Sequence, residues 1–189
     1  MKYAAIVIGL SSGGMNAIKK LLYALPSGFP VPIVIVQHLG SRSDSTWISN
    51  LDQNSNLQVK EADEKETIIK GRVYIAPPNY HLLIEKDKTF SLTIGEKVNF
   101  ARPSIDLLFE SAADAYTHSL IGVVLTGSNH DGANGLKRIQ EKGGFILVED
   151  PLTAEAPGMP SSAIALTKPD RVLPLEELIK ELIGMVQNN

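Results

Sequence analysis

A serine on a glycine-rich turn is the first residue of this sequence whose type and position could do chemistry. Residues 9–14 read Gly-Leu-Ser-Ser-Gly-Gly and lie between an apolar run, 4–8, and a stretch with helical character, 15–25. Gly9 to Gly13 fits the pattern G-x-S-x-G, which presents a nucleophilic serine on a sharp turn between a strand and a helix. The free N–H groups at the helix start can stabilise the negative charge that develops when Ser11 attacks a carbonyl.

Two further residues could supply what a serine nucleophile needs. A serine hydroxyl attacks poorly until an imidazole accepts its proton, and the imidazole needs a carboxylate to fix its tautomer. His38 follows a second apolar run, 31–36, and Asp131 lies in the loop after a third, 120–126. Ligands of an open α/β sheet bind at the carboxyl ends of its strands, so we expect Ser11, His38 and Asp131 to meet there. Their order along the chain differs from that of the common α/β-hydrolases.

Each of these residues also has a purely structural interpretation. Ser11 could cap the following helix, His38 could be a satisfied histidine at a strand end, and Asp131 could cap the helix that begins at Ala133. The agreement of three strand ends favours the hydrolase interpretation over three unrelated structural roles.

Nucleotide binding is the rival function for the first turn. Ser11 takes the place of the middle glycine of G-x-G-x-x-G, the glycine that lets the backbone approach a pyrophosphate. The second strand ends in Gln37-His38 where a dinucleotide site needs an acidic residue, and the sequence contains no G-x-x-x-x-G-K-[ST] motif. The pattern therefore argues against a nucleotide.

Composition and charge exclude several classes of protein. The chain has 189 residues, which suits one domain, and 43% of them are hydrophobic and 21% charged, as in ordinary globular proteins. A net charge of −3 gives no electrostatic footprint for nucleic acid or for an anionic membrane. The absence of cysteine excludes disulfides and thiol chemistry, and the four scattered histidines lack metal-ligand spacing. No run is long enough to span a membrane and no secretory signal precedes the domain, so we expect a cytoplasmic protein without membrane insertion.

The order of the elements predicts the fold class. Short β-branched runs alternate with helical patterns, which predicts an α/β fold: a doubly wound, mostly parallel sheet with helices on both faces. Strands are expected at 4–8, 31–36, 73–76, 120–126, 145–148 and 171–173. Helices are expected at 15–25, 43–52 (capped by Ser43 or Asp44), 103–116, 133–142, 160–167 and 175–186. Alternation over 81–84 and 90–94, around a turn-like Lys-Asp-Lys, predicts a small antiparallel hairpin.

A series of short motifs points to a family. In chain order they are Ile8–Gly14, Gln37-His38, Tyr74–Pro77, Arg102–Asp106, Leu125–Ala133 and Gly158–Pro160. With these motifs the sequence resembles, over nearly its whole length, the catalytic domain of the CheB-type chemotaxis protein-glutamate methylesterases. The resemblance implies that Ser11 is the nucleophile, that His38 is the general base and that Asp131 orients His38. These are the same three residues that the strand ends select.

The resemblance also implies a substrate and a way of holding it. The expected substrates are γ-glutamyl methyl esters on the cytoplasmic helices of chemoreceptors, which release methanol, and some members of the family deamidate glutamines. Backbone N–H groups near Ser12, Gly13 and Ser128 would bind the oxyanion, and no metal or organic cofactor is needed. Arg102 could orient the acidic substrate or be a surface arginine before a helix, and Met159 could line the cleft or pack in the core.

The sequence departs from the family pattern in three ways. It begins just before the first strand, so we expect residues 1–189 to form a single catalytic domain without the family's receiver domain; such a domain stands alone or is controlled by a separate receiver-domain partner. The usual Thr-Gly-Met-Gly-x-Asp-Gly motif carries Ser128 and Asn129 in place of methionine and glycine. His130 adds an imidazole beside Asp131. Two alternatives stay open: an esterase for another acyl substrate, and a non-catalytic signalling adaptor on the same fold. His81 and His118 are not expected to be catalytic.

Overall fold

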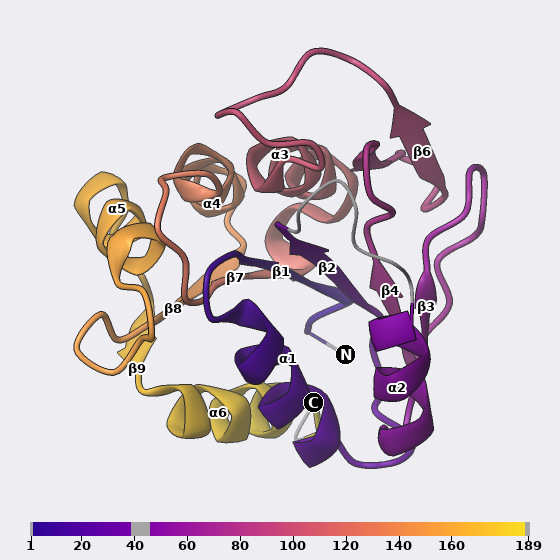
Figure 1. The fold of residues 1–189 in the computed structure, drawn as a ribbon, viewed down its shortest axis with the longest axis horizontal. Helices are drawn as coiled ribbons and strands as arrows, with labels where there is room; N and C mark the ends of the chain where they lie inside the picture. The colour runs from indigo at the N-terminus through magenta and orange to yellow at the C-terminus, as the bar shows by residue number, and fades with distance from the viewer. Residues whose placement is uncertain (1, 39–45, 188–189) are drawn as a thin grey trace.

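The computed structural model of the protein describes residues 2–38 and 46–187, and a parallel sheet forms its centre (Figure 1). The sheet has seven strands in the order β3-β4-β2-β1-β7-β8-β9, and every neighbouring pair is parallel. The strands are β1 (Ala5–Leu10), β2 (Ile33–Gln37), β3 (Gln58–Glu61), β4 (Arg72–Ile75), β7 (Leu120–Val124), β8 (Phe145–Glu149) and β9 (Arg171–Leu173).

The central strands are buried on both faces. All residues of β1, β2 and β7 are buried, which accounts for their continuous apolar runs in the sequence. Helices therefore cover both faces of the sheet, and each face has its own core of apolar side chains. The predicted doubly wound fold is confirmed.

The helices divide between these two faces. One face is covered by α1 (Gly14–Ala24), α2 (Thr46–Asn54) and α6 (Leu175–Gln187), whose apolar side chains share one core with Ile6 and Ile35. The other is covered by α3 (Ile105–Tyr116), α4 (Ala133–Glu141) and α5 (Gly158–Leu166), which pack around Val7 and Val34. In Figure 1 the first group lies below the sheet, and α3 and α4 lie above it. A 3-10 turn, η1 (Thr117–Ser119), joins α3 to β7.

The antiparallel hairpin forms as predicted beside the main sheet. β5 (His81–Ile84) pairs with β6 (Phe90–Thr93), and the pair packs against α3. Leu82, Ile84 and Phe90 bury their side chains in the α3 core. The hairpin therefore holds the chain between β6 and α3 close to the sheet edge where α3 begins.

The structure adds one strand that the sequence pattern did not predict. β3 is an edge strand, and only Val59 of its four residues is buried, so it lacks the apolar run that marks the inner strands. The strands and helices that the sequence did predict all form, with ends that differ by a few residues. α2 runs from Thr46 to Asn54, and the predicted caps Ser43 and Asp44 lie outside the described residues.

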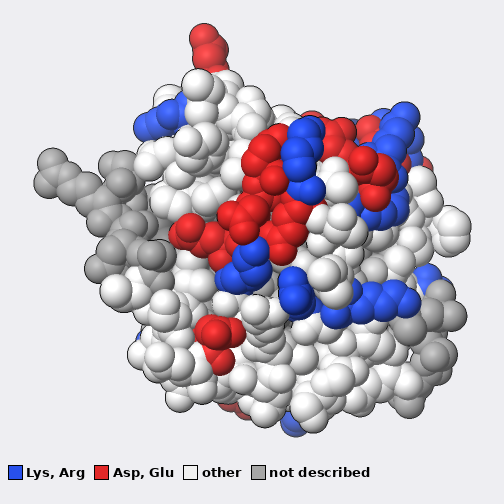
Figure 2. Space-filling view, turned by 90° about the vertical axis from the view of Figure 1, so that its right-hand side faces the viewer, with Lys and Arg blue, Asp and Glu red and all other residues white. Residues whose placement is uncertain are grey.

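Figure 2 shows the side of the molecule at the right of Figure 1, where β3 and the hairpin lie. Acidic side chains gather there with Lys and Arg among them. Lys60 of β3 pairs with Asp63 and Glu66 of the segment that follows, at 2.7 and 2.9 Å. This face therefore presents a cluster of acidic side chains next to basic ones. No helix in the described part of the chain is long and apolar enough to cross a membrane.

Candidate functional site

The candidate site lies where the strand order reverses. β1 pairs with β2 on one side and with β7 on the other, and the chain leaves these three strands at the same edge of the sheet. Ser11 follows β1, His38 follows β2, and Asp131 ends the loop after β7. Such a switch point is the usual ligand site of an open α/β sheet. The three strand ends that the sequence selected are therefore neighbours.

The turn after β1 is fixed from both sides. The Ser11 N–H donates to the carbonyl of Thr126, across the switch point, at 2.9 Å. The buried Gln37 donates its side-chain amide to the carbonyls of Ser11 and His38, at 2.9 and 2.8 Å. Gly13 has a φ of +79°, a left-handed conformation that favours glycine, and it caps α1 without a side-chain hydrogen bond. Ser11 therefore does not cap the helix with its side chain.

His38 and Asp131 form a hydrogen-bonded pair. His38 Nε2 lies 2.9 Å from Asp131 Oδ2, with the carboxylate fully buried and the imidazole 11% exposed. Asp131 accepts every other hydrogen bond that it makes through its side chain, so the proton of this contact belongs to His38 Nε2. The Nδ1 atom of a neutral His38 then carries the lone pair that a general base requires.

The Asp131 carboxylate sits at the start of helix α3. The N–H groups of Ile105 and Asp106 donate to it at 2.7 and 3.2 Å, and the Ser104 hydroxyl and the Asn99 amide donate at 3.1 and 3.0 Å. Burial alone would raise the pKa of Asp131, but the hydrogen bonds from His38, Ile105 and Asn99 hold it below its ordinary value. Asp131 is therefore an ionised carboxylate that fixes His38.

Asp106 mirrors Asp131. It lies in the first turn of α3, and its Oδ1 accepts the N–H groups of Gly132 and Gly135 at the start of α4, at 2.9 and 2.8 Å. Each of the two helices thus offers its N-terminal N–H groups to the acid that belongs to the other. Burial raises the pKa of Asp106, and the nearby charge of Asp131 adds to the rise against the hydrogen bond from Gly135. The exchange locks α3, α4 and the Asp131 loop together.

A cavity of about 330 Å³ brings the candidate nucleophile and base together. Ser11, His38, Asn129 and the segment 99–103 line it. Among the described residues, the Ser11 hydroxyl has no hydrogen-bond partner, and His38 Nδ1 instead lies 3.3 Å from the amide nitrogen of Asn129. Asn129 also accepts the N–H of Asp131 through its Oδ1 at 3.2 Å. The nitrogen that would take the proton of Ser11 is therefore occupied by a neutral amide donor.

The other residues predicted for the site surround this cavity. The Ser128 hydroxyl donates to the Ser12 hydroxyl at 2.9 Å, which joins the two loops expected to bind an oxyanion. Arg102 lines the cavity, and its Nη1 donates to the carbonyls of Ile94 and Gly95, each at 2.8 Å. Its guanidinium therefore fastens the loop after β6 to the cavity wall.

Met159 is buried and packs against the loop of Ser128 rather than lining the cavity. Its N–H donates to the carbonyl of Gly127 at 2.7 Å, and a side chain on Gly127 would overlap its sulfur atom. Met159 therefore supports the backbone next to Ser11, which agrees with the packing role left open for it.

The three remaining histidines do not line the cavity of Ser11. His81 is buried, accepts the N–H of Ser104 through Nδ1 at 3.1 Å, and donates from Nε2 to the carbonyl of Glu96 at 2.8 Å. It is a neutral, satisfied histidine that positions Ser104. His130 and His118 are exposed, and no hydrogen bond joins the imidazole of His130 to Asp131.

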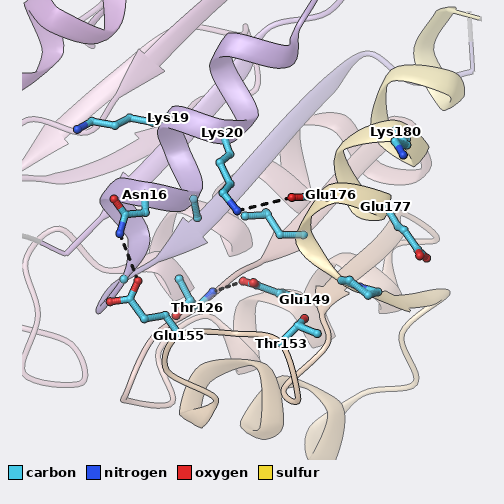
Figure 3. A pocket seen from close by; sticks show the side chains of 14 residues that line it. Asn16, Lys19, Lys20, Thr126, Glu149, Thr153, Glu155, Glu176, Glu177 and Lys180 are labelled. Atoms are coloured by element: carbon cyan, nitrogen blue, oxygen red, sulfur yellow. Dashed lines mark hydrogen bonds and ion pairs between the residues drawn. The ribbon is translucent and has the colours of Figure 1, made fainter.

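A second cavity, of about 730 Å³, also borders the glycine-rich turn after β1 (Figure 3). Gly13 and Thr126 contribute to it, and long charged side chains of α1, α6 and the loop after β8 form a large part of its wall. Lys20 and Glu176 approach each other across it at 3.7 Å. The buried Glu149 accepts the N–H of Thr126 at 2.8 Å, and burial raises its pKa against that hydrogen bond.

Sequence reasoning missed several of the residues that hold the site. Gln37, Asn99, Asp106 and Asn129 contact Ser11, His38 or Asp131, yet none was predicted to do so. Asp106 and Gln37 stood inside the family motifs, and a buried polar side chain at a strand end or helix start needs partners. That requirement was the available signal.

Comparison with known proteins agrees with this geometry. The sequence model of the CheB methylesterase family matches residues 6–182. The chain belongs to the CheB methylesterase family. The predicted resemblance is thereby confirmed, and methylester hydrolysis is the activity of this family.

Individual relatives cover the chain fully. A putative protein-glutamate methylesterase/protein-glutamine glutaminase of Leptospira interrogans is 60% identical over 189 residues, which are all of this chain and 98% of that protein. A protein-glutamate methylesterase/protein-glutamine glutaminase of Rhodospirillum rubrum is 38% identical over 95% of this chain, and the match covers 50% of the Rhodospirillum protein. The CheB methylesterase catalytic domain of Thermotoga maritima superposes with a TM-score of 0.93 at 36% identity, over 98% of this chain and all of that domain.

Proposed function

We propose that this protein hydrolyses γ-glutamyl methyl esters of chemoreceptors through Ser11, His38 and Asp131. The observation that carries the proposal is the hydrogen bond between His38 Nε2 and the buried Asp131, in a protein where His38 and Ser11 line the same cavity. The relatives named as protein-glutamate methylesterase/protein-glutamine glutaminase support the same substrate class.

The reaction runs in two halves. Ser11 Oγ attacks the ester carbonyl while His38 Nδ1 takes its proton, and the tetrahedral intermediate expels methanol, which receives that proton from His38. Water, deprotonated by His38, then attacks the acyl-enzyme; the glutamate carboxylate leaves and Ser11 regains its proton. A glutamine side chain follows the same course with ammonia as the leaving group. Attack requires the Ser11 hydroxyl to take the place of Asn129 at His38 Nδ1.

Backbone N–H groups beside Ser11 would stabilise the oxyanion. Among the described residues, nothing accepts a hydrogen bond from the N–H groups of Ser12, Gly13 and Ser128. Ser12 and Ser128 are joined through their hydroxyls, so these donors come from two loops held against each other. Preorganised donors of this kind lower the barrier to acyl transfer by about 3–4 kcal/mol each in other hydrolases.

The partners of the proposed reaction follow from its substrate. Methylated helices of chemoreceptors would dock over the cavity of Ser11, and Arg102 at its rim suits their acidic side chains. The proposal assigns catalysis to one domain over residues 1–189, in the cytoplasm where those helices lie, with control by a separate receiver-domain protein.

Methanol release from a methylated chemoreceptor cytoplasmic fragment tests the proposal. We expect the protein to release methanol and Ser11→Ala to abolish the release with an unchanged circular dichroism spectrum. Ser161→Ala, which truncates an exposed serine on α5, serves as the matched control and keeps the activity. Persistent release by Ser11→Ala would remove Ser11 from the mechanism. No release by either protein would favour another acyl substrate or the adaptor.

A further inference from the structure

An exposed aromatic side chain stands on a strained turn at the rim of the Ser11 cavity. Val98 and Ala101 pair through both of their N–H groups, at 3.1 and 2.9 Å, and leave Asn99 and Phe100 as a two-residue loop. Both loop residues have positive φ, +50° and +63°. A loop of this kind favours Asn-Gly because its second residue must adopt a left-handed conformation, which a bulky side chain opposes.

The side chain that causes this strain has no packing role. Phe100 is 94% exposed, so its ring contributes almost no apolar burial to the fold. Glycine at this position would serve the turn better. Strained residues that the surrounding structure holds in place cluster at binding and catalytic sites. The absence of a structural benefit therefore points to a contact made with another molecule.

The turn is attached rigidly to the catalytic machinery. Asn99, next to Phe100, donates its amide to Asp131 at 3.0 Å and to Asp106 at 2.9 Å. Phe100 lines the same cavity as Ser11 and His38. Any protein segment whose glutamyl side chain reaches Ser11 must cross the rim of this cavity, where the phenyl ring stands.

We propose that Phe100 determines substrate specificity by packing against an apolar side chain of the protein substrate, beside the esterified glutamyl residue. This inference rests on the proposed function and deepens it. Burial of the ring on binding would bring the apolar contact that the free protein lacks. The Val98–Ala101 bridge and the hydrogen bonds of Asn99 fix the backbone that carries the ring, so this backbone loses little freedom on binding.

The test compares Phe100→Gly with Lys65→Gly. Lys65 is also an exposed residue with positive φ, +63°, and it does not line the Ser11 cavity. Both substitutions relieve left-handed strain, and we expect each to raise Tm, by about 2–4 °C. The expected difference is in binding. Phe100→Gly raises the Kd for a methylated chemoreceptor fragment about tenfold. Phe100→Leu brings the Kd most of the way back to that of the unaltered protein, and Lys65→Gly leaves the Kd within twofold.

Two further readings separate this inference from the proposed function. Binding is measured in a Ser11→Ala background, so that it does not depend on turnover, and we expect KM for the fragment to rise in Phe100→Gly while kcat holds. Labelling of Ser11 by a small fluorophosphonate, too short to reach past the rim, reports the nucleophile alone and stays unchanged in Phe100→Gly. The role of Phe100 is overturned if the fragment binds Phe100→Gly as tightly as the protein with Phe100, or if it binds neither of them. Failure of the label at Ser11 counts against the proposed mechanism instead.

Discussion

Two cavities flank the turn after β1, and they differ in how their polar groups are held. The cavity of Ser11 is the smaller, at about 330 Å³, and the His38–Asp131 pair beside it is fixed by the N-terminus of α3 and by the amide of Asn99. The cavity of Glu149 measures about 730 Å³, and exposed side chains such as Lys20 and Glu176, 59% and 77% exposed, supply most of its charge (Figure 3). The charged side chains of the larger cavity are therefore less firmly held than His38 and Asp131 beside the smaller one.

The difference shows what makes a site in this fold. Catalysis needs groups that already stand in place when charge develops, because rearranging them costs free energy at the transition state. Behind His38, which lines the smaller cavity, the buried Asp131 accepts five hydrogen bonds that fix its position. In the larger one the contact of Lys20 with Glu176 is a surface ion pair, worth about 0–1 kcal/mol. We therefore assign chemistry to the first cavity only.

The largest effect on kcat is expected from a change to Asp131, the carboxylate behind His38 of the smaller cavity. Asp131→Asn replaces an acceptor-only group by an amide, which cannot satisfy all of the donors around it and favours the wrong tautomer of His38. We expect kcat for methanol release to fall by about 10³–10⁴-fold, as in other serine hydrolases. Asp63→Asn, an exposed acid on the segment after β3, is the control and keeps kcat. A loss below tenfold would refute the role of Asp131.

A smaller effect follows from releasing His38. Asn129→Gly removes the amide that occupies His38 Nδ1, so Ser11 no longer competes with it. A neutral hydrogen bond contributes about 0.5–1.5 kcal/mol, so we expect kcat to rise about 2- to 10-fold. Steady-state kinetics measure the change, with Asn79→Gly, at an exposed asparagine that does not line the Ser11 cavity, as the control. A fall in kcat would mean that Asn129 helps to orient His38.

Glu149, which lines the larger cavity, is expected to make the free energy of unfolding of the protein depend on pH. Burial raises the pKa of Glu149 above its ordinary value of 4.5. Its contribution to stability is therefore fully present below the pKa of the unfolded chain, and is lost as pH rises through the higher folded pKa. Glu149→Gln lacks this loss, so its free energy of unfolding, relative to the unaltered protein, should rise from pH 4 to pH 7.

Urea denaturation at several pH values measures that difference. Glu176→Gln, at the exposed rim of the same cavity, is the matched control and should show no such trend. A difference for Glu149→Gln that stays flat between pH 4 and pH 7 would contradict a buried carboxylic acid at this position.

The smallest effect concerns the charged rim of the larger cavity. Lys20→Ala removes one partner of an exposed ion pair. We expect the free energy of unfolding to change by less than about 1 kcal/mol and kcat to stay within twofold, because the pair is exposed to solvent and lies outside the Ser11 cavity. A tenfold loss of kcat in methanol release would show that the two cavities work together.

The sequence predicted the inner part of the fold because that part obeys simple patterns. β1, β2 and β7 are buried on both faces and therefore show unbroken apolar runs, and the helices around them keep helical spacing. β3 escaped prediction because only Val59 is buried on this edge strand. Its remaining residues, Gln58, Lys60 and Glu61, are polar and exposed or half-buried, so they resemble those of a loop.

The sequence predicted the site residues that follow strands, but it did not predict the residues that hold them in place. Ser11, His38 and Asp131 follow buried strands that are neighbours at the switch point, so topology alone brings them to one edge. The exchange of Asp106 and Asp131 between α3 and α4 depends on how two helices pack, which no local pattern encodes. The contact of Asn129 with His38 likewise depends on the path of a loop.

The most direct test of the central claim is to find the nucleophile by mass spectrometry. The unaltered protein is treated with a fluorophosphonate, digested, and the modified residue located. The account predicts a single adduct on Ser11, at a rate that falls sharply in His38→Ala and hardly at all in Lys20→Ala. An adduct on Ser12 or Ser128 instead, or labelling of Ser11 that does not depend on His38, would contradict it.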